Sequence, residues 1–229
     1  MGDMVEFTSN GNNARGYLAT PEQGAAPGIV VVQEWWGLHP QIQRVCDRLG
    51  AEGFTALVPD LYHGDLAEHT EMDKAAELMN AMPIDRAVRD MSGAVDFLAG
   101  HDAVRGDGVG VVGFCMGGFL ALLLAAKRPD KVQAVVSYYG VMPDPDQVDV
   151  AGIKAAVQGH FATADGFMPV DAARAVEQKL EDAGADVQFH YYEAGHAFAN
   201  EDDPIGTYHE DHARTAWVRM LEFLRAHLG

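Results

Sequence analysis

Cys115 stands between two glycines where a short apolar run gives way to a helix-forming run. Residues 109–112 read Val-Gly-Val-Val, the next five read Gly-Phe-Cys-Met-Gly, and 119–126 hold only Phe, Leu and Ala. This order predicts a strand, a sharp turn and a helix, the arrangement called a nucleophile elbow. A helix N-terminus favours a thiolate, so the predicted chemistry is nucleophilic attack. The alternative is that Cys115 is a small residue packed in the core.

An acid and a histidine follow two later strands of the predicted sheet. Asp165 comes after the strand 155–158, and His196 comes after the strand 187–191. Parallel strands present their carboxyl ends at one edge of a sheet, so both side chains are expected near Cys115. A free thiol with a pKa of about 8.5 needs an imidazole to take its proton, and a carboxylate orients that imidazole. The chain order of nucleophile, acid and histidine therefore predicts a Cys-Asp-His triad.

Both of these later residues have an alternative interpretation. Asp165 could instead cap a helix or a loop, and His196 is one of ten histidines. His160 is the main rival, but it lies on the strand that leads to Asp165 and therefore precedes the acid in the chain. His196 is favoured because it follows the strand after which the catalytic histidine is expected.

The segment 33–37, Gln-Glu-Trp-Trp-Gly, ends the third predicted strand. In a sheet of this type, that strand end supplies one of the two N–H groups that stabilise a tetrahedral oxyanion, and we assign them to Trp35 and Met116. Glu34 beside the thiol is predicted to keep it protonated at rest, through like-charge repulsion and hydrogen bonding. The alternative is a surface glutamate at a strand end, but the two tryptophans that follow indicate a lined pocket.

The elements that position these residues alternate between strand and helix after an antiparallel start. Two short strands around residues 10–12 predict a hairpin, and the continuous apolar run from Gly28 is typical of a parallel strand buried on both faces. A loop rich in Pro and Asp spans 142–149. This pattern predicts an α/β fold with a mostly parallel central sheet, helices on both faces and an N-terminal antiparallel hairpin. The predicted strands are 5–8, 15–19, 28–33, 54–58, 109–112, 132–136, 155–158 and 187–191, and the predicted helices are 41–51, 70–99 with a break before Pro83, 119–126, 170–183 and 206–227.

Length and composition bound the class of protein further. With 229 residues, of which 48% are hydrophobic, the chain is long enough for one domain, which we assign to residues 1–229. No run of 18 apolar residues is present, so no membrane span is expected, and the first residues do not resemble a secretion signal. Two cysteines make no disulfide framework, and Cys46 is expected to fill the core. Together these features predict a cytoplasmic protein.

The charge balance limits the partners. The chain has 16 basic and 34 acidic residues and a formal net charge of −18. Nucleic acids and anionic membrane surfaces need a basic footprint, so neither is an expected partner. No set of Cys and His ligands is apparent, with His209 and His212 assigned to a surface helix, so neither a metal nor another cofactor is expected. The expected partner is a small-molecule substrate, and the chain is expected to be a monomer or a homodimer.

Four motifs, in order along nearly the whole chain, resemble the dienelactone hydrolase (carboxymethylenebutenolidase) family. They are Gln-Glu-Trp-Trp-Gly at 33–37, Gly-Phe-Cys-Met-Gly-Gly at 113–118, Tyr-Tyr-Gly at 138–140 and Gly-His-Ala-Phe at 195–198. The resemblance implies an α/β-hydrolase fold and a triad at Cys115, Asp165 and His196. It also implies that Glu34 hydrogen-bonds the resting thiol until substrate displaces it. The aromatic pocket positions of the family correspond to Trp36, Tyr139 and Phe167.

One substrate-binding position departs from the family pattern. Family members that open dienelactone carry an arginine four residues after the histidine, where this chain has Asn200, and residues 66–85 contain no arginine either. Asparagine lacks the charged fork of donors that arginine offers a carboxylate, so dienelactone does not follow as the substrate. We expect a hydrolase that cleaves a small lactone or ester through an acyl-enzyme intermediate. The alternatives are a thioesterase or acyl hydrolase with a larger substrate, and a ligand-binding or thiol redox-sensing protein without turnover.

Overall fold

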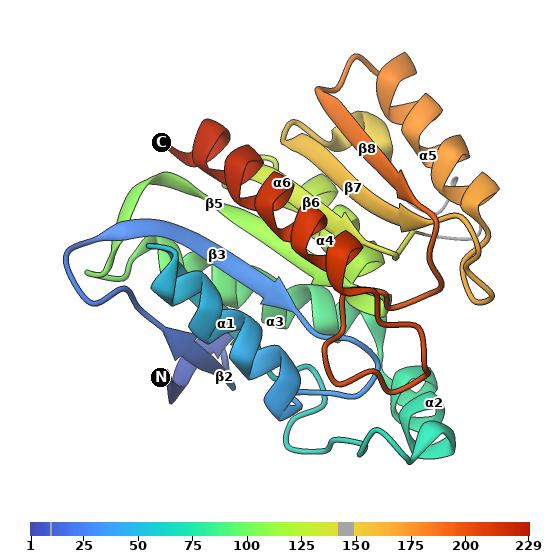
Figure 1. Cartoon of the computed structure of the whole chain (residues 1–229). Helices are drawn as coiled ribbons and strands as arrows, with labels where there is room; N and C mark the ends of the chain where they lie inside the picture. The colour runs from blue at the N-terminus through green and yellow to red at the C-terminus, as the bar shows by residue number, and fades with distance from the viewer. Residues whose placement is uncertain (10, 142–148) are drawn as a thin grey trace.

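The computed structural model describes residues 1–9, 11–141 and 149–229 of the chain (Figure 1). Residues 142–148 of the predicted Pro- and Asp-rich loop, and Asn10 of the predicted hairpin turn, lie outside the described residues. The strands are β1 Asp3–Ser9, β2 Asn12–Ala19, β3 Ala26–Val32, β4 Thr55–Pro59, β5 Val104–Phe114, β6 Val132–Tyr138, β7 Ala156–Ala162 and β8 Val187–Tyr192. The helices are α1 Pro40–Ala51, α2 Met72–Ala81, α3 Ile84–Ala99, α4 Met116–Lys127, α5 Val170–Asp182 and α6 Glu210–Leu228, with a short 3-10 helix at Val150–Gly152.

The eight strands form one sheet in the order β1-β2-β4-β3-β5-β6-β7-β8. β2 pairs antiparallel with both β1 and β4. The remaining pairs, from β4 and β3 to β7 and β8, are parallel. The predicted mostly parallel sheet with an N-terminal antiparallel hairpin is therefore confirmed. Because the parallel strands share one direction, their carboxyl ends meet along one edge, where the loops of the site lie.

Helices cover both faces of the sheet, so hydrophobic residues are buried on each side. Figure 1 shows α1 and α6 on the face toward the viewer, with α3 and α4 behind the sheet. The apolar residues of β3 divide between the two sides: Val30 and Val32 belong to the core cluster of α3, α4 and α5, whereas Ile29 and Val31 belong to that of α1 and α6. This division explains why the strand is apolar throughout rather than alternating.

Several predicted elements are longer in the structure, most of all β5, which begins at Val104 rather than at residue 109. Two further boundaries differ because of tertiary contacts. β7 continues past residue 158, because Gly159, His160 and Phe161 pair with β8 and the buried His160 ring is hydrogen-bonded on both nitrogens. α6 begins at Glu210 rather than at residue 206. The residues before it are held in a loop instead, since Asp203 accepts the N–H of Tyr208 at 2.8 Å. In the described ranges, no helix is both long enough and apolar enough to cross a membrane.

Candidate active site

The turn between β5 and α4 places Cys115 at its tip, with φ of 54° and ψ of −121°. This conformation costs a non-glycine residue about 1–3 kcal/mol, so the surrounding structure must enforce it. Two glycines allow the close approach that does so. A Cβ on Gly113 would lie 1.9 Å from the carbonyl oxygen of Gly117, and a Cβ on Gly117 would lie 2.4 Å from that of Val32. The structure thus has the predicted order of strand, sharp turn and helix.

His196 links the Cys115 thiol to a buried carboxylate. Its Nε2 lies 3.2 Å from Sγ of Cys115, and its Nδ1 lies 2.7 Å from Oδ2 of Asp165. The other carboxylate oxygen, Oδ1 of Asp165, accepts the N–H groups of Phe167 and Met168 at 2.8 Å each. These two bonds fix the carboxylate, which in turn orients the ring toward the sulfur. Loops after β5, β7 and β8 therefore bring the three predicted residues together in the order that a triad requires.

The charge of His196 follows from these contacts. Burial by itself lowers the pKa of the imidazole, but the hydrogen bonds and charges of Asp165 and Cys115 outweigh it and raise this pKa to about 10. The ring therefore stays protonated at neutral pH. In that form both ring nitrogens are donors, one toward the Asp165 carboxylate and the other toward the Cys115 sulfur.

Glu34 is the second acid of the site, and its side chain is buried. Oε1 accepts the hydroxyl of Tyr139 at 3.1 Å, and Oε2 accepts the amide of Asn200 at 2.8 Å. Burial raises the pKa of Glu34, and the hydrogen bonds offset this only in part. Among the described residues, the hydrogen-bond partner of the Cys115 sulfur is His196 and not Glu34. The expected bond between Glu34 and the resting thiol is thus not present here, because the thiol is turned toward the imidazole.

Asn200, expected at a substrate-binding position, lies behind Glu34. Its side chain is fully buried and is absent from the described residues that line the cavity. The amide donates to Glu34, and its oxygen accepts the backbone N–H of Asp202 at 3.1 Å. In this structure, Asn200 therefore holds the Glu34 carboxylate in place rather than facing the cavity. A longer arginine at this buried position would have to displace its neighbours.

A cavity of about 370 Å³ opens over the thiol, within the size range of small-molecule sites. Glu34, Cys115 and His196 form its ionisable part, and the lining residues that the structure describes include no Lys or Arg. Phe167 is 57% exposed, whereas Trp36 and Tyr139 are buried. All three predicted aromatic positions are in the wall, whose aromatic and aliphatic members are Trp35, Trp36, Met79, Met116, Phe119, Tyr139, Val141, Phe167, Met168, Ala197, Pro204 and Ile205.

The two predicted oxyanion donors both belong to residues of this wall. Neither the backbone N–H of Trp35 nor that of Met116 has a hydrogen-bond acceptor within the described part of the chain, so both are available to a ligand. Tyr62 touches both residues, because its hydroxyl donates to the carbonyl of Trp35 at 3.1 Å and lies 3.7 Å from Sδ of Met116. These contacts of Tyr62 could not be expected from the sequence, in which Tyr62 stands alone in a polar loop.

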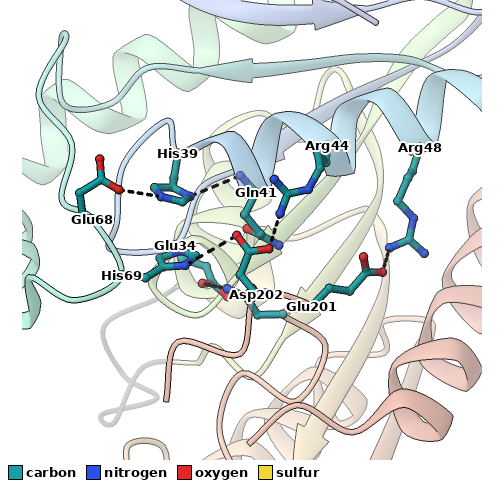
Figure 2. A network of polar contacts seen from close by, with 10 residues as sticks. Glu34, His39, Gln41, Arg44, Arg48, Glu68, His69, Glu201 and Asp202 are labelled. Atoms are coloured by element: carbon teal, nitrogen blue, oxygen red, sulfur yellow. Dashed lines mark hydrogen bonds and ion pairs between the residues drawn. The ribbon is translucent and has the colours of Figure 1, made fainter. Parts of the chain in front are cut away.

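A second group of ionisable side chains lies beside the first (Figure 2). His39, His69 and Asp202 each present one possible ligand atom for a metal, and these atoms lie within 4.8 Å of one another. They come from the loops after β3, β4 and β8. No such set was expected from the sequence, because the three residues are far apart in the chain and form no spacing motif.

The sheet order and the elbow after β5 define the α/β-hydrolase fold, in which the nucleophile follows that strand and the acid and histidine follow later ones. Comparison with known proteins agrees. The model of the dienelactone hydrolase family matches residues 14–228.

Relatives and solved structures give the same family. Protein usf of Aquifex pyrophilus is 37% identical over 235 residues, and a "Putative carboxymethylenebutenolidase" of Aquifex aeolicus is 36% identical over 235 residues. Each alignment covers 100% of both chains. The crystal structure of a "Putative Dienelactone Hydrolase" from Klebsiella pneumoniae superposes with a TM-score of 0.84 at 29% identity, covering 98% of this chain and 99% of the other. The chain belongs to the dienelactone hydrolase family and is a hydrolase of that family.

Proposed function

We propose that the protein hydrolyses a small uncharged lactone or ester, with Cys115 as the nucleophile. The observation that carries this proposal is the continuous contact from thiol to imidazole to carboxylate, with 3.2 Å between Sγ and Nε2 and 2.7 Å between Nδ1 and Oδ2. Such a chain supplies a nucleophile, a proton carrier and a group that orients the carrier.

In the proposed reaction, the Cys115 thiolate attacks the carbonyl carbon of the ester. The carbonyl electrons move onto its oxygen, which the N–H groups of Trp35 and Met116 stabilise. When the tetrahedral intermediate collapses, the C–O bond breaks and the His196 imidazolium gives its proton to the departing alkoxide. A thioester with Cys115 remains. For a lactone, the released hydroxyl stays attached to the acyl group.

The second half of the proposed reaction releases the acid. His196, now neutral, takes a proton from water as the water oxygen attacks the thioester carbonyl. Collapse of this intermediate breaks the C–S bond and restores the thiolate beside a protonated His196. Asp165 remains hydrogen-bonded to Nδ1 throughout and favours the charged ring in both halves.

The surroundings of the thiol support an uncharged substrate. The cavity is mostly apolar, and the described residues in its wall offer no cation to a substrate carboxylate. Glu34 adds a negative charge to that wall whenever it is ionised, which further disfavours an anion. Cleavage of dienelactone, which bears a carboxylate, is therefore not the activity that we propose.

A second candidate is hydrolysis of a thioester or ester with a larger leaving group. An outer cavity of about 420 Å³ shares Phe167, His196, Pro204 and Ile205 with the inner one. A leaving group on the His196 side could extend into this space. Rates for a series of esters with one acyl group and increasingly long alcohols or thiols distinguish the two candidates. Rates that rise with leaving-group length favour the second.

Replacement of the thiol tests both candidates. We expect Cys115→Ala to lower kcat/KM for an activated aryl ester by several orders of magnitude, as removal of a triad nucleophile does, while circular dichroism and Tm remain near those of the wild type. Cys46→Ala is the matched control, because this second cysteine is fully buried. Retention of more than about a tenth of the wild-type kcat/KM by Cys115→Ala would contradict the assignment. A wild-type protein without esterase activity, but with a stable sulfenate at Cys115, would instead favour a redox sensor.

A further inference from the structure

Tyr62, in the loop after β4, contacts both residues whose N–H groups are assigned to the oxyanion. Its hydroxyl donates to the carbonyl oxygen of Trp35 at 3.1 Å and lies 3.7 Å from Sδ of Met116. The side chain is buried and is not among the described residues that line the cavity, so it acts through its neighbours. We propose that Tyr62 is a positioning residue, whose hydroxyl holds the backbone of Trp35 where its N–H reaches the oxyanion. This inference rests on the oxyanion donors of the proposed hydrolysis.

Trp35 lies in a turn whose own closing bond is weak. The turn runs from Glu34 to Gly37, and the N–H of Gly37 donates to the carbonyl of Glu34 at 3.4 Å, which is long for such a bond. The carbonyl of Trp35 belongs to the central peptide of this turn, whose rotation converts one turn type into another. In the described part of the chain, the hydrogen bond to this carbonyl comes from Tyr62. Because the N–H of Trp35 shares its Cα with the central peptide, fixing that peptide also restrains the donor.

The ring and the backbone of Tyr62 are themselves held in place. Gly37 has φ of 94°, and a Cβ there would lie 3.1 Å from Cδ2 of Tyr62, so glycine allows the turn to pack directly on the ring. The N–H of Tyr62 donates to Oδ1 of Asp60 at 3.2 Å. The other oxygen of this buried acid accepts Nε of Arg15 at 2.8 Å. The hydroxyl is thus presented to Trp35 from a fixed support.

The same hydroxyl also contacts the second donor residue. Met116 is the first residue of α4 and directly follows Cys115, so its N–H lies beside the nucleophile. A hydroxyl has one proton, and the shorter contact assigns it to the carbonyl of Trp35, which leaves a packing contact with the sulfur of Met116. Burial raises the pKa of Tyr62, and the charge of Cys115 raises it further, so the hydroxyl keeps this proton at neutral pH.

A positioning role of this kind affects the transition state more than the bound substrate. The carbonyl oxygen of an ester gains its negative charge only as the thiolate attacks, so a displaced donor weakens mainly the transition state. Tyr62→Phe keeps the ring against Gly37 and removes only the hydroxyl. We expect kcat to fall by about 10- to 100-fold, less than the roughly 10²- to 10³-fold cost of deleting an oxyanion donor, while KM stays within about twofold. The loss of one hydrogen bond should lower Tm by about 2–4 °C, so the variant is expected to fold.

Binding of an aliphatic aldehyde such as butanal tests the proposal without turnover. When the Cys115 thiolate adds to the aldehyde, the C–S bond forms, the carbonyl electron pair moves onto the oxygen, and the negative charge passes from sulfur to that oxygen. We expect Tyr62→Phe to raise the Kd of the aldehyde, measured by calorimetry, by the same factor of about 10 to 100. Alkylation of Cys115 by iodoacetamide forms no oxyanion, so its rate and pH profile should match those of the wild type. A side chain that only supported the fold or the thiol would change both measurements.

The matched control is Tyr17→Phe. The Tyr17 hydroxyl is also hydrogen-bonded, to Asp47 at 3.0 Å, but it belongs to β2 and is not among the described residues of the cavity wall, so this variant should bind butanal as the wild type does. The proposal is overturned if the wild type forms no adduct at Cys115, if Tyr62→Phe binds the aldehyde as tightly as the wild type, or if alkylation slows by the same factor as binding weakens. A wild type that binds the aldehyde in the expected way but hydrolyses no ester would overturn only the proposed hydrolysis, so the two proposals fail separately.

Discussion

Two histidine–carboxylate clusters lie at the same edge of the sheet, and they hold their imidazoles in opposite charge states. In the first, His196 lies within 3.2 Å of Cys115 and 2.7 Å of a carboxylate whose side chain is 2% exposed. In the second, His69 is 3.7 Å from a carboxylate that is 30% exposed and already paired with Arg44. The pKa of His196 is raised to about 10, whereas that of His69 is lowered.

The difference shows that contact with a dedicated acid, rather than burial, decides the charge of an imidazole here. Burial lowers the pKa of both rings. Of the two, only His196 has its pKa raised above the ordinary value, through direct hydrogen bonds to Asp165 and Cys115. A charged ring suits a proton donor beside the Cys115 sulfur, a role that a neutral ring cannot take. The two clusters thus differ in charge although they are built from the same residue types.

If Asp165 loses its charge, the His196 imidazole should become neutral, as the His69 imidazole is. We expect Asp165→Asn to lower kcat by up to about 10⁴-fold, the cost of losing this acid in a serine triad. The pKa of His196 should fall from about 10 toward its ordinary value, because its main stabilising partner no longer carries charge. NMR titration of the His196 ring measures this directly. Asp171→Asn on the exposed surface of α5 is the control, and an unchanged His196 titration in Asp165→Asn would contradict the account.

The first cluster could be predicted from the sequence because its signals are local. Gly113 and Gly117 mark the elbow, since no other residue type fits where a Cβ would meet a carbonyl oxygen within 2.4 Å. Asp165 and His196 then follow from chain order, because strand ends converge at one edge. The pattern of apolar residues along the chain was likewise sufficient to predict the sheet and the helices that cover it.

The second cluster and the environment of Glu34 could not be predicted in this way. His39, His69 and Asp202 meet only through the packing of three loops, and their spacing in the chain carries no motif. Asn200 was expected to face the substrate, and nothing local shows that it is buried behind Glu34. The direction of the Cys115 thiol toward His196 also depends on its side-chain rotamer, which cannot be inferred from the sequence.

The next largest expected effect is on substrate preference, because the described residues of the cavity wall include no cation. A substrate carboxylate would lack a charge-assisted contact worth about 1.5–3 kcal/mol. A neutral ester should therefore be preferred over a carboxylate-bearing ester of equal size by about 10- to 150-fold in kcat/KM at low salt. Glu34→Gln should narrow this gap, since it removes a like charge from the wall. A wild-type preference of tenfold or more for the anionic ester would show that another cation reaches the cavity.

The smallest expected effect concerns Glu34, which connects the two clusters through Asn200 and the N–H of Asp202. Its pKa is raised in the folded protein because it is buried, so the folded state holds this proton more tightly than the unfolded state does. Stability should therefore fall as pH rises from the unfolded pKa of about 4.5 through the raised folded value.

The variant Glu34→Gln tests this pH dependence. Glutamine does not titrate, and it can still accept from Asn200 while donating to the Tyr139 hydroxyl. We expect Glu34→Gln to have a Tm about 2–4 °C above the wild type at pH 8, the shift that 1 kcal/mol gives in a chain of this size. This difference should shrink as pH falls, because the wild-type carboxyl then takes up its proton in the folded state. Scanning calorimetry of both proteins at pH 5, 6.5 and 8 measures the difference, and a gap that stays constant or widens as pH falls would show that Glu34 carries no buried charge at neutral pH.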